Sequence, residues 1–356
     1  MDSVFLKACR GERTPYTPVW LMRQAGRYMK EYRELRDKIS FLNLCRKPET
    51  AARITVEAQQ KIGADAAIIF SDILLVVDAL GLGLDYLKGD GPQVRRPVRS
   101  TSDIDRLPDV EPGDKLAYVY SAIRSAKKSL NGVPLIGFAG APFTIASYMI
   151  EGGASKDFAR TKRLMRSDPP AWGRLASKIA RLTLRHLAAQ IEAGADCVQL
   201  FDSWVGALGR DEYKEHVLPH SRHVLKGLAG RVPVIHFGTG TGPFLEAFAE
   251  AGGDVIGVDH RMKLADAWKR IGPRAIQGNL DPQILLTDPD RIRDEAQDIL
   301  LQAAGRPGHI FNLGHGVLPN TPVENVIALV DAVHELSRGS DPDLNQSKLR
   351  GLTPDG

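Results

Sequence analysis

The stretch Glu192-Ala193-Gly194-Ala195-Asp196-Cys197-Val198-Gln199-Leu200-Phe201 decides the fold of this 356-residue chain. It has the pattern of a helix end, a glycine cap and then a short, mostly apolar strand. The same order occurs at Lys61-Ile62-Gly63-Ala64-Asp65 and at Glu250-Ala251-Gly252-Gly253-Asp254. A unit that leads from a helix to a buried strand three times predicts alternating helices and parallel strands.

Eight apolar runs follow one another along the chain, and most precede turn residues and a segment with helical periodicity. They are residues 18–23, 66–70, 134–140, 196–201, 232–237, 254–259, 275–278 and 309–313. Eight short strands alternating with helices predict a single (β/α)8 barrel of the TIM type, an α/β fold of about 250 residues that grows by insertion. An open doubly wound sheet is the alternative, and it would also carry its site at the carboxyl ends of the strands.

The barrel is predicted to form one domain over residues 1–337, with a short N-terminal extension. Residues 338–356 form a polar tail with Pro, Gly, Asp and Ser, which we expect to be disordered. Residues 89–114 contain four prolines. They are predicted to form an excursion from the barrel with a short strand at 93–98, without a domain boundary.

Composition and charge favour a soluble protein that acts on a small anion. The chain is 43% hydrophobic and 25% charged, and its net charge of +4 is spread along the sequence, which gives no nucleic-acid footprint. The N-terminus lacks the features of a secretory signal, and the longest apolar stretch, 73–84, is too short to span a membrane. We therefore expect a cytoplasmic protein. Cys9, Cys45 and Cys197 are too widely spaced for a disulfide framework or a metal motif and are expected to be plain thiols.

Two arginines end the first apolar run, in Trp20-Leu21-Met22-Arg23-Gln24-Ala25-Gly26-Arg27. The first three residues are predicted to form a buried strand, and Ala25-Gly26 a turn at which backbone can approach another group closely. Arginine stays charged and binds carboxylates through paired N–H donors, so two of them at a strand end favour a substrate with several carboxylates. The alternative is a solvated helix start with surface arginines.

Polar residues follow several of the other runs. Asp72 and Ser203 come after the second and fourth runs at matching places in the repeat, Tyr148 follows the third run and His315 the eighth. The carboxyl ends of barrel strands carry the chemistry, so these residues are candidates for one site. Structural alternatives are helix capping for Asp72 and Ser203 and core packing for Tyr148. His315 lies between two glycines, which leave its imidazole room to face a ligand.

Two further patterns carry less weight. The loop 238–242, Gly-Thr-Gly-Thr-Gly, lacks the Lys-Ser/Thr ending of a P-loop and the full G-x-G-x-x-G spacing, although its backbone could still approach a ligand. His216, His220 and His223 have the spacing of a metal site on one helix face, but Pro219 is expected to break or kink that helix. A solvated or packed helix is therefore the better interpretation.

Five motifs together resemble those of the uroporphyrinogen decarboxylase family. They are R-Q-A-G-R at 23–27, F-S-D at 70–72, G-F-A-G-A-P-F-T at 137–144 with Tyr148, Q-L-F-D-S-W at 199–204, and N-L-G-H-G-V at 312–317. The resemblance runs, in order, from about residue 4 to about residue 336. Lys30 stands where the family usually has proline, a difference that affects how the next helix begins rather than a ligand.

The resemblance implies a homodimer of barrels with facing clefts. It implies removal of CO₂ from the four acetate side chains of uroporphyrinogen III, giving coproporphyrinogen III in haem and chlorophyll biosynthesis, with neither a metal nor an organic cofactor. It also implies a cleft lined by Arg23, Gln24, Ala25, Gly26, Arg27, Asp72, Tyr148, Ser203 and His315, with Arg36 a weaker candidate. Arg23, Arg27 and Asp72 are the predicted catalytic residues.

The chemistry of this reaction agrees with the residues. The eight carboxylates of the substrate account for the arginines, and its inward-pointing pyrrole N–H groups suit one central aspartate. Protonating a pyrrole carbon makes the ring a cationic electron sink, which an ionised Asp72 would stabilise, so that the substrate replaces a cofactor. Arg23 would hold the reacting acetate or help to deliver the proton, and Tyr148, Ser203 and His315 would position the other side chains.

Two other function classes stay open at this point. One is a zinc- or corrinoid-dependent methyltransferase on the same scaffold, which would need His-x-Cys where this chain has His236-Phe237-Gly238. The other is a non-catalytic tetrapyrrole-binding protein, which would not need Asp72 and the arginines together.

Overall fold

The structure is a computed structural model that describes residues 3–87 and 91–338. The predicted disordered tail, apart from Arg338, lies outside the described residues. No helix in the described part of the chain is long and apolar enough to cross a membrane.

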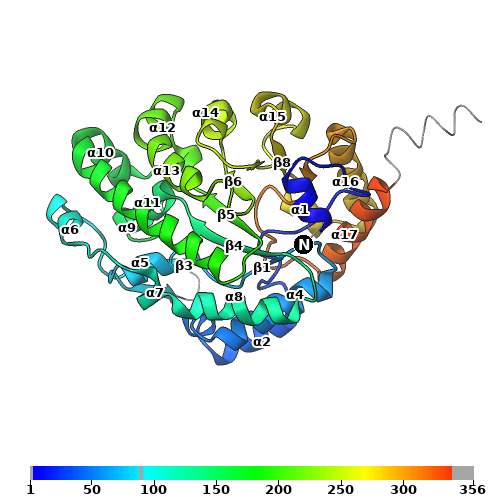
Figure 1. Ribbon diagram of the computed structural model, residues 1–356, viewed down its shortest axis with the longest axis horizontal. Coiled ribbons are helices and arrows are strands. Elements are labelled where there is room, and N and C mark those ends of the chain that lie inside the picture. Colours follow the sequence, from blue (N-terminus) through cyan, green and yellow to red (C-terminus); the bar gives the residue numbers. More distant parts are fainter. Residues whose placement is uncertain (1–2, 88–90, 339–356) are drawn as a thin grey trace, which may run out of the picture.

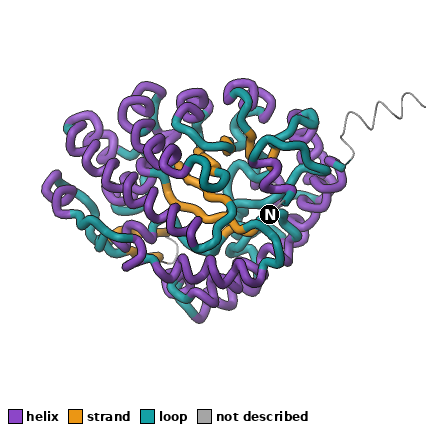
Figure 2. Tube along the Cα trace, viewed as in Figure 1, coloured by secondary structure: helices purple, strands orange, loops and turns teal. Residues whose placement is uncertain are grey.

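Seven parallel strands form one curled sheet in the order β1-β4-β5-β6-β7-β8-β9. They lie in the middle of the molecule with helices around them (Figures 1 and 2). The strands are β1 (Ala67–Ile68), β4 (Leu135–Gly140), β5 (Cys197–Asp202), β6 (Val234–Gly238), β7 (Val255–Gly257), β8 (Ala275–Gln277) and β9 (His309–Ile310). The α/β barrel of the TIM type predicted from the sequence is confirmed, and each of these strands falls within, or one residue beyond, a predicted run.

The first apolar run, 18–23, is not a strand, which corrects the expectation of eight. Val19 alone forms an isolated parallel bridge, with Phe311 just after β9, and the amide of Asp65, just before β1, donates to the Val19 carbonyl at 2.8 Å. The Trp20 amide still donates to the Phe311 carbonyl at 3.4 Å. The two amides after it bond side chains instead of a strand: Leu21 donates to Gln24 Oε1 and Met22 to Asn312 Oδ1. The run therefore closes the barrel between β9 and β1 with one residue and then leaves it as a turn.

The repeated aspartate sits at the amino-terminal end of the barrel at all three places. Asp65, Asp196 and Asp254 each accept, at 2.7 or 2.8 Å, a backbone N–H from the preceding barrel segment. Each also donates its own amide to the carbonyl of that same residue at 2.8 Å. The repeat thus ties three neighbouring pairs of barrel segments together at the end opposite the predicted site.

The helices that cover the barrel are mostly the long ones. They are α4 (Pro48–Ile62), α8 (Ala117–Ser129), α9 (Pro142–Glu151), α10 (Ala159–Ser167), α11 (Pro169–Glu192), α12 (Arg210–His216), α13 (Leu218–Leu228), α14 (Leu245–Glu250), α15 (Leu264–Ile271), α16 (Pro289–Ala303) and α17 (Val323–Ser337). Short helices fill the connections: α2 (Lys30–Lys38), α3 (Phe41–Cys45), α5 (Leu75–Ala79), α6 (Thr101–Arg106) and α7 (Pro112–Lys115), with 3₁₀ turns at Val205–Ala207, Gly242–Phe244 and Pro282–Leu286. Lys30 is the first residue of α2, a position that proline also suits.

Helix α1 (Val4–Cys9) is the predicted N-terminal extension. Its buried residues, among them Phe5 and Cys9, pack in one cluster with residues of the barrel interior such as Ala66 and Cys197. All three cysteines of the chain are free and buried. Cys9 lies close enough to Cys197 to raise the pKa of that thiol, to which burial contributes most. The helix therefore covers the interior of the barrel with apolar side chains.

The excursion after β1 contains an antiparallel hairpin, β2 (Leu84–Leu87) and β3 (Gly91–Val94). The strand predicted at 93–98 therefore begins earlier and ends earlier. The amides of Arg95 and Arg96 still donate to Gly83 and Leu82, but Pro97 has no amide hydrogen and cannot extend the pairing. The amide of Val94 donates to the carbonyl of Gly152 at 2.8 Å, which holds the hairpin against the end of α9.

Candidate active site

The turn after Met22 presents Arg23 in a constrained conformation. Arg23 has φ 64°, a left-handed conformation that is uncommon for residues other than glycine, and its side chain is exposed. Gly26 makes the turn possible, because a side-chain carbon there would lie 2.7 Å from the carbonyl oxygen of Arg23. The prediction that this glycine allows a close backbone approach is confirmed.

Gln24 supports the turn from below. Its side chain is buried, with Oε1 accepting from the Leu21 amide and Nε2 donating to the Ala66 carbonyl, both at 3.0 Å. Both ends of the amide are thus used by the protein. The backbone of Gln24 is used as well, because its amide donates to the Leu21 carbonyl at 2.9 Å and its carbonyl accepts the Tyr28 hydroxyl at 2.7 Å. Gln24 therefore shapes the turn, and the neighbouring Ala25 and Gly26 are half-buried.

The N-L-G-H-G-V segment lies beside Arg23. A side-chain carbon at Gly316 would overlap the Arg23 side chain, so the glycine lets the arginine lie over this segment. Neighbouring His315 keeps an exposed surface, and its pKa is lowered by partial desolvation and then by the charge of Arg23. The imidazole is therefore neutral at neutral pH and can both donate and accept hydrogen bonds.

Asp72 lies at the carboxyl end of β1, where one of its oxygens has a local role. Oδ1 accepts the amide of Leu74 at 2.7 Å, a bond within the turn before α5; the N-cap of α5 is Leu74, and no side chain caps that helix. The other oxygen, Oδ2, makes no hydrogen bond with any described residue. Burial raises the pKa of Asp72, while the Leu74 amide, Tyr86 and the charge of Arg23 lower it. One carboxylate oxygen is thus available to a ligand opposite a fixed cation.

Tyr148 lies near Asp72 and Arg23, whose charges act on its pKa after the larger effect of burial, and Ser203 lies in the loop after β5, next to Trp204. Tyr148 stacks on Trp204 with ring centroids 3.7 Å apart, and Trp204 also packs against Phe158 at 5.0 Å. The Trp204 amide donates to Thr144 Oγ1 at 3.2 Å, which joins the loop after β5 to α9. Ser203 is half-buried, and its hydroxyl has no partner among the described residues, so it remains free to bind a ligand.

Aromatic side chains of the barrel interior lie below these polar groups. Phe138 of β4 and Phe201 of β5 are half-buried and meet edge to face at 5.5 Å, and Phe201 meets Phe237 of β6 at 5.8 Å. Sequence analysis did not single these residues out. The sequence feature that could have revealed them is the alternation of side chains along each strand, which puts residues two apart on the same face.

Tyr86 of β2 is a second residue that sequence analysis missed. Its pKa is raised by burial and then by Asp72, and Tyr148 also contributes, so the hairpin reaches the same group of side chains. A tyrosine in an irregular excursion has no periodic pattern that would reveal this.

Arg27 and Arg36 lie toward α2. Arg27 is exposed. Burial raises the pKa of Tyr32 to about 12, and the charges of Arg36 and, less strongly, Arg27 oppose this rise. Arg36 donates to the carbonyl of Ile39 at 2.8 Å and lies 5.7 Å from the centre of the Phe41 ring. The structure therefore brings together Arg23, Asp72, Tyr148 and His315, with Arg27 and Arg36 farther along the same N-terminal segment.

The glycine-rich loop at 238–242 has a structural use. The amide of Gly240 donates to Asp259 Oδ2 at 2.7 Å, and Thr239 Oγ1 donates to the carbonyl of Ser203 at 2.5 Å. The loop thus links the connections that follow β5, β6 and β7.

The three-histidine pattern is divided between two helices. Helix α12 ends at His216, and α13 begins at Leu218, with Pro219 in its first turn, so the predicted break is confirmed. Within the described residues, no group of three or more His, Cys, Asp or Glu side chains is arranged to hold a metal ion.

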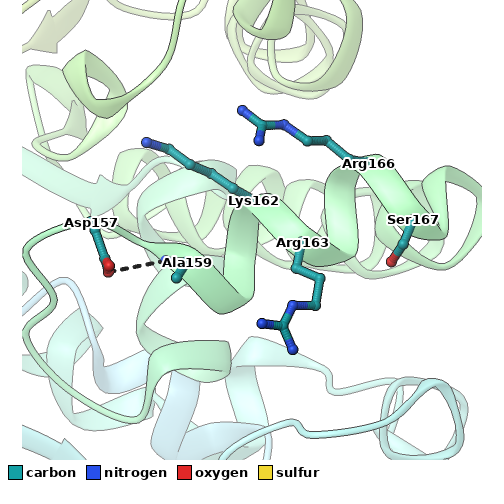
Figure 3. Close-up of a pocket in the computed structure, with 6 residues that line it drawn as sticks. All are labelled: Asp157, Ala159, Lys162, Arg163, Arg166 and Ser167. Carbon is teal, nitrogen blue, oxygen red and sulfur yellow. Dashed lines mark hydrogen bonds between the residues drawn. The ribbon is translucent and has the colours of Figure 1, made fainter.

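A shallow surface hollow lies on α10, away from the predicted residues. It is lined by Asp157, Ala159, Lys162, Arg163, Arg166 and Ser167. Lys162 and Arg166 extend from one side of the helix and Arg163 from the other (Figure 3), and Arg166 pairs with Glu212 at 2.6 Å. None of the predicted site residues lines it.

Asp202, the last residue of β5, is a buried carboxylate on the opposite face of its strand from Phe201. Thr144 donates to Oδ1 at 2.7 Å, whereas Oδ2 has no partner among the described residues. Burial raises the pKa of Asp202 to about 7, and the Thr144 bonds only partly oppose this. Asp202 therefore binds a proton in the folded protein at a pH where the unfolded chain has released it.

Asp202→Asn is expected to stabilise the protein at alkaline pH. Because the folded pKa lies above the unfolded one, the contribution of Asp202 to the free energy of unfolding is complete below 3.8 and is lost as the pH rises to about 7. Asparagine does not titrate, so the variant avoids this decrease in the free energy of unfolding, which is on the order of 3 kcal/mol. Urea unfolding of both proteins at pH 5 and pH 8.5 measures it, and an equal difference between the two proteins at both pH values would contradict the assignment.

Comparison with known proteins decides the family. A family model described as uroporphyrinogen decarboxylase (URO-D) matches residues 2–336. The chain belongs to the uroporphyrinogen decarboxylase family. A relative named uroporphyrinogen decarboxylase from Carboxydothermus hydrogenoformans is 53% identical over 340 residues, which cover 95% of this chain and 97% of that one. Another of that name, from Sorangium cellulosum, is 53% identical over 349 residues, or 96% of this chain and 100% of the relative.

Among solved structures, the fold of this family member is similar to that of a methyltransferase from Methanosarcina mazei, with a TM-score of 0.79, 19% identity, and coverage of 94% of this chain and 99% of that one. At that identity the likeness concerns the fold. His236, where the zinc-dependent alternative would need the first residue of His-x-Cys, is buried and stacks on Phe248 with ring centroids 3.7 Å apart. It lies on the face of β6 opposite Phe237, outside the barrel interior.

Proposed function

We propose that this protein removes CO₂ from the four acetate side chains of uroporphyrinogen III to give coproporphyrinogen III, in porphyrin biosynthesis. The observation that carries the proposal is that Asp72, which follows β1, lies near enough to Arg23 to feel its charge, in a member of this family, while the second oxygen of the carboxylate is available to a ligand. This arrangement matches a substrate that is anionic at its rim and carries N–H donors at its centre.

The reaction needs a place for the electrons that CO₂ leaves behind. A proton added to a pyrrole carbon makes that ring cationic. The bond from the acetate CH₂ to its carboxylate then breaks, and the electron pair neutralises the ring as CO₂ departs. A second proton on the CH₂ carbon and loss of the first from the ring give a methyl group, so that each acetate consumes one proton.

Asp72 stabilises the cationic ring and accepts the pyrrole N–H groups. Its charge does not have to be created during the reaction, which is why a preorganised carboxylate is effective there. The Leu74 amide keeps the carboxylate in place through Oδ1, and Arg23 favours its ionised form. Positive charge on the substrate ring favours the ionised form further as it develops.

The remaining residues bind and orient the substrate. Arg23 holds the reacting carboxylate or helps to supply the proton, and Arg27 binds a carboxylate farther from the centre, because each guanidinium offers paired donors. Tyr148, Ser203 and neutral His315 position propionates and acetates. Phe138 and Phe201 exclude water beneath the macrocycle, which strengthens the interaction between Asp72 and the ring.

We further propose a cytoplasmic homodimer that uses no metal or organic cofactor and binds neither nucleic acid nor membranes. The support is the family resemblance together with the electron-sink property of the substrate itself, which takes the place of a cofactor. Analytical ultracentrifugation over a concentration range tests the dimer.

Turnover of the reduced substrate is the decisive experiment. We expect anaerobic incubation with uroporphyrinogen III to yield products with seven, six, five and finally four carboxyl groups, at a rate that chelators do not change. Activity lost to a chelator and restored by zinc would contradict the cofactor-free mechanism. Binding without any loss of carboxyl groups would instead show a tetrapyrrole-binding protein.

A further inference from the structure

Tyr86 is held over the site by a row of aromatic rings. It belongs to β2 of the hairpin, which is outside the barrel sheet. Its ring lies 4.6 Å from that of Phe41 in α3, and Phe41 lies 5.7 Å from Phe70, two residues before Asp72. The packing of three rings thus fixes the hairpin against the strand end that carries the carboxylate.

The Tyr86 hydroxyl is buried and has no hydrogen-bond partner within the described parts of the chain. A tyrosine hydroxyl removed from water normally finds a partner, because an unsatisfied one costs free energy. Burial raises the pKa of Tyr86 most. The groups that raise it further are Asp72 after β1, by its charge and as a nearby hydrogen-bond acceptor, and then Cys45 of α3 and Tyr148 of α9. The partner of the Tyr86 hydroxyl is therefore one of these three groups or a bound ligand.

Asp72 is the acceptor that suits this hydroxyl best. A thiol is a weak acceptor and a phenol is neutral, whereas hydrogen bonds to a carboxylate are about twice as strong as those between neutral groups. Oδ1 of Asp72 already accepts the Leu74 amide, whereas Oδ2 has no bond among the described residues, so Oδ2 has the greater capacity to accept the hydroxyl. A small movement of the hairpin, or a rotation of the carboxylate when substrate binds, would complete the contact.

We propose that Tyr86 is a positioning residue whose hydroxyl donates to Oδ2 of Asp72 in the working enzyme, an inference that rests on the role proposed for Asp72. The bond fixes the plane of the carboxylate from the side opposite Leu74 and opposes the effect of burial on its charge. Each oxygen keeps a second lone pair for the pyrrole N–H groups. Because burial and Asp72 both raise the pKa of Tyr86, the phenol keeps its proton and remains a donor at every pH where the enzyme works.

Tyr86→Phe tests the proposal, because it removes the hydroxyl and keeps the ring that packs on Phe41. Without the donor, the pKa of Asp72 rises. The acid limb of the kcat profile then moves to higher pH by about one unit, and kcat at neutral pH falls by up to about tenfold, while KM changes little. A rise in KM with an unchanged pH profile would contradict the proposal and show that Tyr86 binds a substrate carboxylate directly.

A matched control is Tyr213→Phe. Tyr213 is also buried, also lacks a hydroxyl partner within the described residues, and stacks on Phe244 at 4.9 Å beside Asp202 rather than Asp72. We expect the same loss of one buried hydroxyl there to leave the pH profile of turnover unchanged. An equal shift in both variants would mean that the effect is a general loss of stability and would overturn the proposal.

A second measurement does not depend on turnover. With ¹³C-labelled aspartate, the carboxyl resonance of Asp72 is assigned by its disappearance in Asp72→Asn and is titrated in the wild type and in Tyr86→Phe. A rise in its pKa in the variant supports the contact even if uroporphyrinogen is not the substrate. Identical titration curves in the two proteins would contradict the proposed contact between Tyr86 and Asp72, even if decarboxylation is confirmed.

Discussion

Asp72→Asn is expected to give a protein that folds normally and has lost at least about a hundredfold in decarboxylation rate, the size associated with removing one preorganised electrostatic group. Asparagine keeps an oxygen for the Leu74 amide, so the local turn survives. It lacks the negative charge that stabilises the cationic pyrrole. Single-turnover rates with reduced substrate, together with melting temperatures, separate the two effects.

Two further variants serve as controls for Asp72→Asn, one at Asp72 and one at a nearby carboxylate. Asp72→Glu should also be slow, because it moves the charge by about an ångström and errors of that size are costly. Asp78→Asn removes a carboxylate from the next helix, where it pairs with Arg46 at 2.6 Å, and should leave the rate unchanged. If Asp72 acted only as a cap, Asp72→Asn would be nearly silent, because asparagine caps about as well as aspartate.

Arg23→Ala should lower kcat/KM by about ten- to a hundredfold, as expected for losing charge-assisted hydrogen bonds. Arg23→Lys should recover only part of this, because an ammonium group cannot form the paired contact. Steady-state kinetics of both variants measure the effect. Arg53→Ala is the control, since Arg53 is an exposed arginine of α4 whose contact with Glu57 is 3.7 Å long.

The conformation of Arg23 gives this prediction a second readout. Glycine adopts a positive φ without the strain that a side chain brings, so Arg23→Gly should be at least as stable as the wild type while remaining poorly active. A variant that loses stability and activity in parallel would show that Arg23 serves the fold rather than the substrate.

Most of the barrel could be predicted because buried parallel strands leave a strong local signal. Runs such as 134–140 and 196–201 are apolar, short and bounded by turn residues, and they became β4 and β5 almost residue for residue. The strand predicted at 18–23 was wrong because the amides of Leu21 and Met22 bond to the side chains of Gln24 and Asn312. No pattern of hydrophobicity reveals where an amide will find a side-chain acceptor.

The site could be predicted where it follows the carboxyl ends of strands. Asp72 and His315 follow this rule, and the structure places both near Arg23. Tyr86 could not be found in this way, because the hairpin reaches the site through ring packing between distant segments. The burial of Gln24 could not be predicted either, because a glutamine between two arginines gives the same sequence pattern whether it faces a ligand or the core.

The single bridge that closes the barrel has a consequence for how the protein is made. The contact that brings the arginine turn into place joins Met22 to Asn312, which are 290 residues apart in the sequence. During synthesis Arg23 leaves the ribosome early, but the segment around Asn312 emerges much later. Contacts between such distant residues form late, because the loop between them must first be closed. A chain that ends before Asn312 therefore holds Asp72 after β1 without a fixed Arg23, so binding of a polyanion reports that the segment around Asn312 is present rather than that the sheet has formed.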